Sequence, residues 1–251
     1  MSAGNARAAV EAVVLAAGKG TRMKSDLAKV LHRIDGRPLL DHVLDTVEAV
    51  GIGHTVVVVG HQADAVRETC ARPGLDFALQ SPQLGTGHAV QVAVPALRGG
   101  GHTVVLAGDV PLLTADTLAR LVDGSAASGA AATVLTCVVP DAGAYGRIVK
   151  DAGGRVVGIV EARDATPEQR AIREYNTGVF CFRTDLMIEA LAHLTTDNAQ
   201  GEYYLTDTVA WLVGQGHEVT AVATHDPGEV VGINTVDELA EAERLLRARG
   251  A

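Results

Sequence analysis

The sequence gathers four cationic side chains in a glycine-containing segment near its amino terminus. Lys19, Arg22, Lys24 and Lys29 all fall within residues 13–32, VVLAAGKGTRMKSDLAKVLH, which begin with an apolar run. Glycines let backbone N–H groups turn toward one anion, and flanking cations neutralise several negative charges together. The segment therefore predicts a polyphosphate at the end of a first strand. For the loop taken alone, a tight turn with solvated lysines is the favoured interpretation, and the polyphosphate gains support from the motifs that follow.

Two familiar phosphate-binding motifs are disfavoured by the same residues. Gly18 and Gly20 begin a GxGxxG pattern, but Met23 stands where the third glycine belongs. The sequence also contains no GxxxxGK[ST] string. A dinucleotide-binding loop and a P-loop are therefore both poor interpretations, although the physical reasons for anion binding remain.

A carboxylate follows a second apolar run in the string LAGDVPLL. The run Thr103–Leu106 delivers Asp109 just beyond its carboxyl end, where open α/β sheets place ligands. A carboxylate that faces a polyphosphate supplies the hard oxygen ligands that Mg²⁺ prefers. By position alone, an aspartate that starts a turn before Pro111 is an equally good interpretation.

Two glutamines precede a glycine-flanked helix start in the string LQSPQLGTGHAV. The amides of Gln80 and Gln83 can donate and accept hydrogen bonds together, as recognition of a base edge requires. Gly85, Thr86 and Gly87 then open a helix. A polar loop before an ordinary helix is the alternative.

Composition limits the classes of protein that carry these motifs. With 251 residues, 47% hydrophobic and 20% charged, the chain can bury the core of one large α/β domain, with or without a small lobe. Its net charge of -9 repels nucleic acids and anionic membranes. We expect neither as a partner. The three cysteines are odd in number and widely spaced, which fits a reducing cytoplasm. No apolar run reaches the roughly 18 residues of a membrane span, and no cleavable leader is evident.

Short apolar runs alternate with amphipathic stretches, which predicts βα units around a largely parallel sheet. The expected strands are Ala12–Ala16, Thr55–Val59, Val104–Leu106, Thr133–Val138, Gly178–Phe182 and Val219–Val222. Apolar stripes at helical spacing are formed by Leu40, Val43, Leu44 and Val47, and by Leu118, Leu121 and Val122. Residues 140–176 are richer in Pro, Gly and charge, and predict a small β-rich lobe over one sheet edge. Thr235 and Glu238 form a capping-box pattern before a terminal helix that closes on Gly250.

Taken in order, the motifs resemble one family. The strings are LAAGKGTRMKSDLAKVLH, QLGTGHAV, GDVPLL, YGRI, GIVEARDAT, NTGV, NAQGEYYLTD and GINT. From about Ala12 onward the chain resembles the uridyltransferase half of the bifunctional N-acetylglucosamine-1-phosphate uridyltransferase and glucosamine-1-phosphate acetyltransferase family. The first string alone indicates only a nucleotidyltransferase, whereas NAQGEYYLTD is far more specific.

The resemblance implies an α/β, Rossmann-like nucleotidyltransferase fold with a mixed, mainly parallel central sheet and a small inserted β-rich lobe. The implied organisation is a nucleotidyltransferase domain over residues 1–234, with a sugar-binding lobe at about 140–176, and a C-terminal helix over 235–251. The acetyltransferase half is absent from this sequence. We therefore expect uridyltransfer without acetyl transfer, in a monomer or weak oligomer, because the absent half is the part that joins three subunits in the family.

The resemblance also implies roles for individual residues. Nucleotide contacts fall on Ala16, Ala17, Gly18, Gln80, Gln83, Gly85 and Thr86. The catalytic group consists of Arg22, Lys29 and Asp109, and Mg²⁺ is held by Asp109 and Asn234. Sugar-phosphate contacts fall on Gly146, Glu161, Asn176, Tyr204 and Thr206. Without the family, the favoured interpretations are turn residues for Asn176 and Asn234, a strand-end charge for Glu161 and a packed aromatic for Tyr204.

The implied reaction joins UTP and N-acetylglucosamine 1-phosphate to give UDP-N-acetylglucosamine, a peptidoglycan precursor, and pyrophosphate. Two rivals stay open: a related nucleotidyltransferase that uses another NTP or sugar 1-phosphate, and a catalytically silent nucleotide-sugar sensor. The sequence departs from the family at two places. Ala28 stands where members usually have proline, which removes a fixed φ before Lys29. Ala162 and Arg163 replace a common His-Lys pair after Glu161.

Overall fold

The computed structural model describes residues 9–250, so residues 1–8 and Ala251 of the expected segments lie outside the described part. The central sheet comprises β1 (Val10–Ala16), β4 (His54–Val59), β5 (Leu75–Leu79), β6 (His102–Ala107), β7 (Ala132–Val138), β8 (Arg147–Lys150), β9 (Val156–Val160), β10 (Glu174–Arg183) and β11 (Val219–Thr224). The helices are α2 (Leu39–Ala49), α3 (Ala63–Cys70), α4 (Thr86–Ala93), α5 (Ala115–Ser128), α6 (Pro167–Arg170), α7 (Thr184–Leu191), α8 (Asp207–Gly214) and α9 (Val236–Gly250). A separate small hairpin pairs β2 (Arg33–Ile34) with β3 (Arg37–Pro38).

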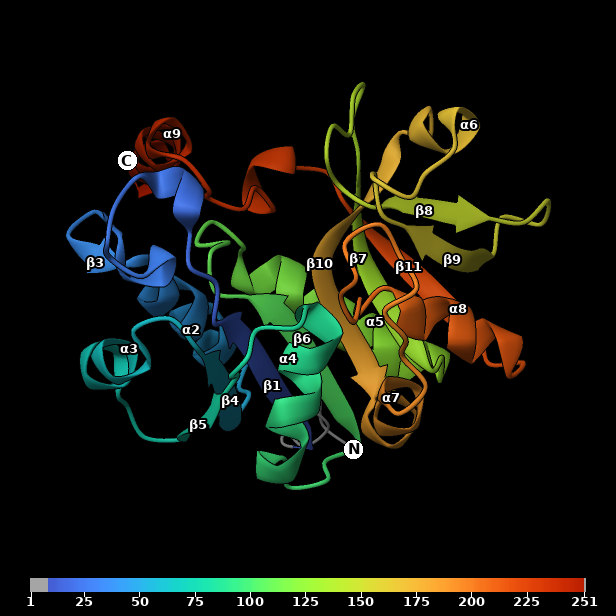
Figure 1. Cartoon of the computed structure of the whole chain (residues 1–251), viewed down its shortest axis with the longest axis horizontal. Helices are drawn as coiled ribbons and strands as arrows, with labels where there is room; N and C mark the ends of the chain where they lie inside the picture. The colour runs from blue at the N-terminus through green and yellow to red at the C-terminus, as the bar shows by residue number, and fades with distance from the viewer. Residues whose placement is uncertain (1–8, 251) are drawn as a thin grey trace.

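The sheet is mixed and mainly parallel, as the sequence predicts. Its strand order is β11-β7-β10-β6-β1-β4-β5 (Figure 1). Neighbours β6, β1, β4 and β5 run parallel, as do β11 and β7, while β10 is antiparallel to both of its neighbours in this order. Each of the six expected strands is present and longer than expected. The edge strand β5 escaped prediction because its sequence, LDFAL, keeps only Ala78 buried.

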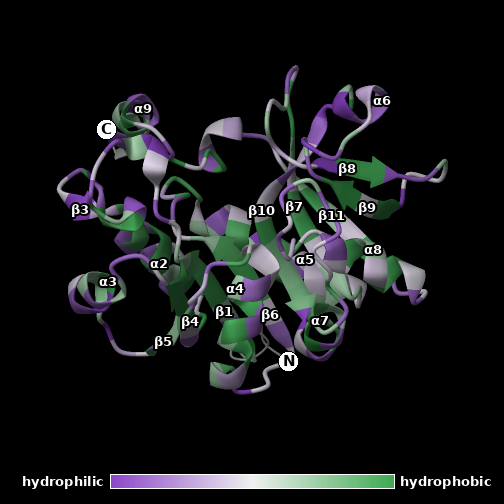
Figure 2. Ribbon diagram, viewed as in Figure 1, coloured by the Kyte–Doolittle hydropathy of each residue, from purple (hydrophilic) through white to green (hydrophobic). Residues whose placement is uncertain are grey.

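Alternate residues of the central strands supply two apolar layers. Val14 and Val57 face a core that includes apolar side chains of α2, α3 and α5, whereas Val13 and Val56 face a second core with α4, α7 and α8. Successive side chains of a strand point to opposite faces, so a strand covered on both sides reads as an unbroken apolar run. Figure 2 shows this hydrophobic centre, and Figure 1 shows α4 and α7 together on one face.

Strands β8 and β9 form a hairpin that leaves the main sheet through β10. The pairing of β10 with β7 shifts register between Asn176 and Phe180, and Gly178 adopts a φ of 81° within the irregularity. An L side chain rarely adopts that conformation, so glycine suits the NTGV motif. The Gly178 N–H donates to Asn176 Oδ1 at 2.9 Å, which fixes the asparagine side chain beside the hairpin.

Helix α9 begins with the predicted capping box. The Glu238 N–H donates to Thr235 Oγ1 at 3.2 Å, and the Thr235 N–H donates to Glu238 Oε2 at 2.9 Å. Ala242 of the helix packs in an apolar cluster with Ile34 and Leu112, which ties it to the β2–β3 hairpin and to the segment after β6. No helix among residues 9–250 is both long and apolar enough to cross a membrane.

A buried charged network lies at the amino ends of the parallel strands. Glu11 of β1 is 4% exposed and faces His54 Nδ1 of β4 at 2.8 Å, while His54 Nε2 faces Asp76 of β5 at 2.9 Å. The N–H groups of Arg98 and Gly100 also donate to Glu11. Burial raises the pKa of Glu11, but these two N–H groups and His54 outweigh it and hold the pKa below its ordinary value.

We expect Glu11→Gln to lower the free energy of unfolding by about 1–3 kcal/mol at pH 7, because buried donors lose a charged acceptor. A carboxyl with a lowered folded pKa contributes stability above its unfolded pKa, about 4.5, and loses the contribution as the pH falls. Urea unfolding from pH 7 to pH 3 should therefore show the difference from the parent shrinking. Glu68→Gln, at an exposed site on α3, is the matched control. A difference that stays constant over this pH range would contradict the assignment.

Candidate functional site

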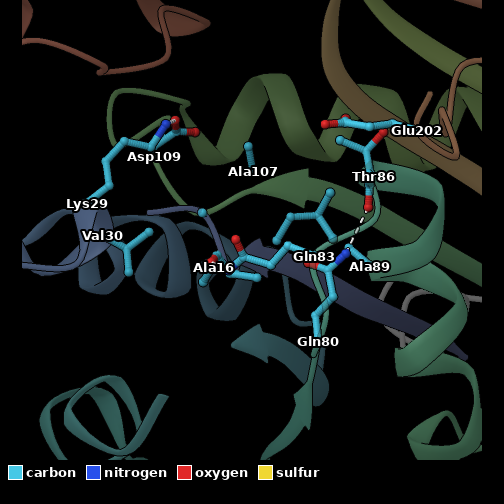
Figure 3. A pocket seen from close by; sticks show the side chains of 14 residues that line it. Ala16, Lys29, Val30, Gln80, Gln83, Thr86, Ala89, Ala107, Asp109 and Glu202 are labelled. Carbon is cyan, nitrogen blue, oxygen red and sulfur yellow. Dashed lines mark hydrogen bonds and ion pairs between the residues drawn. The ribbon is translucent and has the colours of Figure 1, made fainter. Parts of the chain in front are cut away.

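Two adjoining cavities lie over the carboxyl ends of the central strands. The first has a volume of about 360 Å³ and is lined by the seven residues expected to contact a nucleotide, together with Lys29, Asp109 and Glu202. Figure 3 shows Lys29 and Asp109 at one side of this cavity and Thr86 and Glu202 at the other. These residues come from the ends of β1, β5 and β6, from the start of α4 and from the loop before α8.

The second cavity, of about 530 Å³, opens between β10, the β8–β9 hairpin and the start of α9. Its lining includes Gly146, Glu161 and Asn176 of the expected sugar-phosphate set. Arg22, Asp109 and Asn234 line it as well. Because Asp109 and Ala107 line both cavities, the two spaces meet at the end of β6.

Four predicted residues form one hydrogen-bonded group at this junction. The Lys29 ammonium donates to Asp109 Oδ2 and, at 3.1 Å, to Asn234 Oδ1. The Arg22 guanidinium donates to the same Asn234 oxygen at 2.8 Å. Lys29 and Asp109 keep only 16% and 13% of their side chains exposed. The chain thus brings together residues more than two hundred positions apart in sequence.

The loop after β1 needs Gly20 to place Lys29. Gly20 has a φ of 65°, and a Cβ at this position would lie 2.6 Å from the Lys29 Cβ. Short 3₁₀ helices, Thr21–Met23 and Lys29–Leu31, follow this turn and present Arg22 and Lys29 from one loop. A side chain at residue 20 would push the lysine stem away, so glycine sets the close approach.

Ala28 stands where the family that the sequence resembles usually has proline, and its φ angle is still one that proline would adopt. Its φ is -53°, within the range that a proline ring imposes. The Ala28 N–H donates to Gln62 Oε1 at 2.7 Å, a hydrogen bond that proline could not make. Gln62 is a residue that the sequence did not single out.

The two glutamines use their amide nitrogens within the protein. Gln80 Nε2 donates to Gly85 O at 2.9 Å and also faces His88, and Gln83 Nε2 donates to Ala17 O. Among the hydrogen bonds of the described residues, neither amide oxygen has a donor. Each glutamine therefore keeps an acceptor oxygen without a protein partner, where the sequence suggested mixed donor and acceptor groups.

Glu161 is the most perturbed carboxylate beside the second cavity. Thr206 Oγ1 donates to Glu161 Oε1 at 3.0 Å. Burial raises the pKa of Glu161 above its ordinary value, nearby Asp207 and Asp164 raise it further, and the Thr206 hydrogen bond only partly offsets them. Tyr204, 6% exposed, does not line the second cavity; its phenol accepts from Gln200 Nε2 at 2.9 Å. The structure therefore brings Thr206 to Glu161 but leaves Tyr204 packed behind them.

Several lining residues were not predicted. Glu202 adds a carboxylate to the first cavity, and Tyr145 adds an aromatic ring to the second, stacked on Tyr175 with ring centroids 4.6 Å apart. Glu238 also lines the second cavity, and its carboxylate accepts from the Asn234 N–H at 2.6 Å. The capping-box pattern identified Glu238 as a helix cap, but only the fold shows that the cap also holds Asn234.

The donor set at the junction fits a divalent cation with a preference for oxygen. Asp109 Oδ2 and Asn234 Oδ1 already converge on one cationic group, the Lys29 ammonium. Within residues 9–250 there is no group of three or more His, Cys, Asp or Glu side chains that could form a complete metal cage. Mg²⁺ suits such an incomplete set, because it commonly takes few protein ligands and completes its shell with water and substrate phosphates.

The fold and these cavities define an α/β nucleotidyltransferase. Residues 12–208 match the MobA-like NTP transferase domain family, and the chain belongs to that family.

Curated relatives extend the similarity beyond this family match. The chain is 51% identical over 243 residues to the "Bifunctional protein GlmU" of Brevibacillus brevis, covering 96% of this chain and 52% of that protein. The protein of the same name from Paraburkholderia xenovorans is 51% identical over 93% of this chain and 51% of its own length. The protein of the same name from Pelobacter propionicus is 47% identical, over 96% of this chain and 53% of its own length. The chain thus spans about half the length of the curated relatives it matches.

We expect Glu161→Gln to raise the free energy of unfolding by about 1 kcal/mol at pH 8, because an amide keeps the acceptor for Thr206 and removes a buried negative charge. A carboxyl with a raised folded pKa costs stability when ionised, so the gain should vanish as the pH falls toward 4.5. Unfolding at pH 8 and pH 4.5 measures the effect. Glu189→Gln, at an exposed site on α7, is the control. A variant less stable than the parent at pH 8 would contradict this account of Glu161.

Proposed function

We propose that the chain transfers a uridylyl group from UTP to N-acetylglucosamine 1-phosphate, giving UDP-N-acetylglucosamine and pyrophosphate. The observation that carries the proposal is the meeting of two cavities at Asp109, surrounded by Lys29, Arg22 and Asn234. A transfer between two phosphates needs two anions held end to end with cations where they touch. The similarity to GlmU proteins over nearly the whole chain supports the choice of nucleotide and sugar.

The reaction requires no nucleophile from the protein. A sugar-phosphate oxygen, largely ionised at neutral pH because its second pKa is about 6, attacks the α-phosphorus of UTP. The new P–O bond forms as the bond to the β-phosphate oxygen breaks, and the electron pair leaves with pyrophosphate. The work of this chain is to align the two substrates and to neutralise charge. Arg22 and Lys29 are placed to do so at the junction.

Asp109 and Asn234 are the residues that would hold Mg²⁺. When bound, the ion neutralises phosphate charge and orients the triphosphate. Lys29 provides a mobile cation on a flexible stem, and Arg22 a planar guanidinium that can form paired hydrogen bonds with phosphate oxygens. Glu238 acts through Asn234, since it accepts from the asparagine N–H and keeps that segment in place.

The first cavity is proposed to hold the uracil base. Uracil presents an N3–H donor, and the oxygens of Gln80 and Gln83 are acceptors without a protein donor among the described residues. Cytosine has an acceptor at N3 and would leave acceptors facing each other. On the other side, Gly146, Glu161 and Asn176 are proposed to contact the sugar, with Thr206 supporting Glu161 through a hydrogen bond and Tyr204 held by Gln200.

The wider setting is proposed on the same basis. Residues 1–234 would act as the nucleotidyltransferase domain, with 140–176 as the sugar-binding lobe and 235–251 as a C-terminal segment whose helix α9 anchors Asn234. The enzyme would act in the cytoplasm on small molecules, as a monomer or weak oligomer, in the supply of peptidoglycan precursor.

A matrix of nucleotides against sugar 1-phosphates tests the substrate pair. We expect UTP with N-acetylglucosamine 1-phosphate to give the highest kcat/KM, measured as pyrophosphate release with Mg²⁺, and CTP to be at least about 100-fold slower because cytosine has an acceptor where uracil has its N3–H donor. Higher kcat/KM with ATP or GTP would sink the uridyl assignment. Binding of the pair without pyrophosphate release would indicate a nucleotide-sugar sensor instead.

Asp109→Asn tests the junction. We expect kcat to fall by roughly 100-fold or more, because the change removes a negative charge where metal and phosphates gather. The melting temperature should stay close to that of the parent, since Asp109 lies at the cavity surface rather than in an apolar core. Asp116→Asn, at an exposed position of α5, controls for the chemistry of the change. Near-parental activity of Asp109→Asn at low Mg²⁺ would rule out the metal role.

A further inference from the structure

The Lys29 ammonium contacts both oxygens that are proposed to hold a divalent cation. It donates to Asp109 Oδ2 and, at 3.1 Å, to Asn234 Oδ1. An ammonium group carries one positive charge and three donors, so it can satisfy a carboxylate and an amide oxygen together. In this arrangement the lysine occupies the place at which an oxygen-seeking cation would bind.

From this overlap we infer that Lys29 acts as an internal counter-ion that keeps Mg²⁺ out of the nucleotide-free site and yields the site when the triphosphate enters. The inference rests on the proposed role of Asp109 and Asn234 as metal ligands. It adds to that proposal when the metal ion binds: the metal ion and the nucleotide would enter the site together rather than one after the other.

Charge balance at the junction explains why the metal alone is disfavoured. Lys29 contacts Asp109 and Asn234, and Arg22 contacts Asn234. The other carboxylates that line the second cavity are Glu161 and Glu238. Glu238 is engaged by the N–H groups of Asn234 and Thr235, and Glu161 by Thr206. A divalent ion entering alone would meet two cations and would have to displace Lys29 from Asp109, in a pair that is mostly shielded from water. Mg²⁺ also loses its water reluctantly, which weakens its competition further.

The triphosphate changes this balance because it gives Lys29 another anion. Lys29 lines the first cavity, where the nucleotide is proposed to bind, so its ammonium can turn from Asp109 toward a phosphate. The base of the side chain cannot move as freely, since the Lys29 Cβ lies against Gly20. A fixed base and a flexible four-carbon stem favour an exchange at the tip alone.

The test measures Mn²⁺ binding, from the signal of the free ion in electron paramagnetic resonance, to the full chain without nucleotide. We expect the parent to bind weakly and Lys29→Met to bind at least tenfold more tightly, since the competing ammonium is gone. Lys150→Met is the matched control, because Lys150 pairs with Glu174 at 2.5 Å and lines neither cavity. Lys29→Met combined with Asp109→Asn should lose the gain, which ties it to Asp109. Melting curves check that each variant is folded.

A second arm repeats the titration with α,β-methylene-UTP, which cannot release pyrophosphate. The analogue should tighten Mn²⁺ binding to the parent by a factor within the usual ~5–150-fold range for coupled sites, and should tighten it less in Lys29→Met. The inference is overturned if Lys29→Met binds free Mn²⁺ no more tightly than the parent, or if the two proteins show equal coupling. Neither arm requires turnover. A parent that releases no pyrophosphate would refute the proposed function while leaving the Mn²⁺ comparison to decide this inference.

Discussion

The charge of one shielded carboxylate, Asp109, governs the arrangement of the site. A carboxylate that keeps 13% of its side chain exposed needs a cation or several donors nearby, and Lys29 supplies the cation. The segments that meet there are brought by separate structural devices. Strand β6 delivers Asp109, a glycine turn after β1 lets Lys29 approach, and the cap of α9 holds Asn234. Without the Asp109 charge, the cations Lys29 and Arg22 would lie at the junction without the carboxylate that balances their charge there.

Glu11, which is buried, and Glu161, which is partly buried, have opposite consequences for stability. Glu11 receives two backbone N–H groups and faces His54, so its ionised form is favoured and the network fastens the amino ends of the strands. Glu161 receives a single hydroxyl and has acidic neighbours, so ionisation costs stability there. A destabilised charge beside a cavity is a common feature of sites that bind ligands, because a ligand can supply the donors that the protein withholds.

Much of the fold could be predicted because strands covered on both faces appear as apolar runs, and the capping box marked α9. Some cavity-lining residues that lie in loops could not be predicted from the sequence. Glu202 and Tyr145 stand in the quoted strings NAQGEYYLTD and YGRI, but their residue types and spacing do not single them out, and they reach their cavities only through the way their loops fold. Gln62 lies more than thirty residues from the backbone it supports. The predicted site residues gather at the cavities largely because parallel strands end at the same edge, whereas the packed position of Tyr204 depends on side-chain directions that no periodicity reports.

Ala28 shows how a local departure from a family pattern can be compensated at a distance. Proline would restrict φ by its ring, which lowers the entropy of the unfolded chain. Alanine lacks that restriction, but its free N–H donates to Gln62 Oε1 and its φ stays at a proline-like value. The position of Lys29 thus depends on a hydrogen bond that Ala28 donates to Gln62, the residue just before α3, instead of on a ring. The closed geometry is kept without the ring, so the fixed base from which the Lys29 stem extends does not require proline at residue 28.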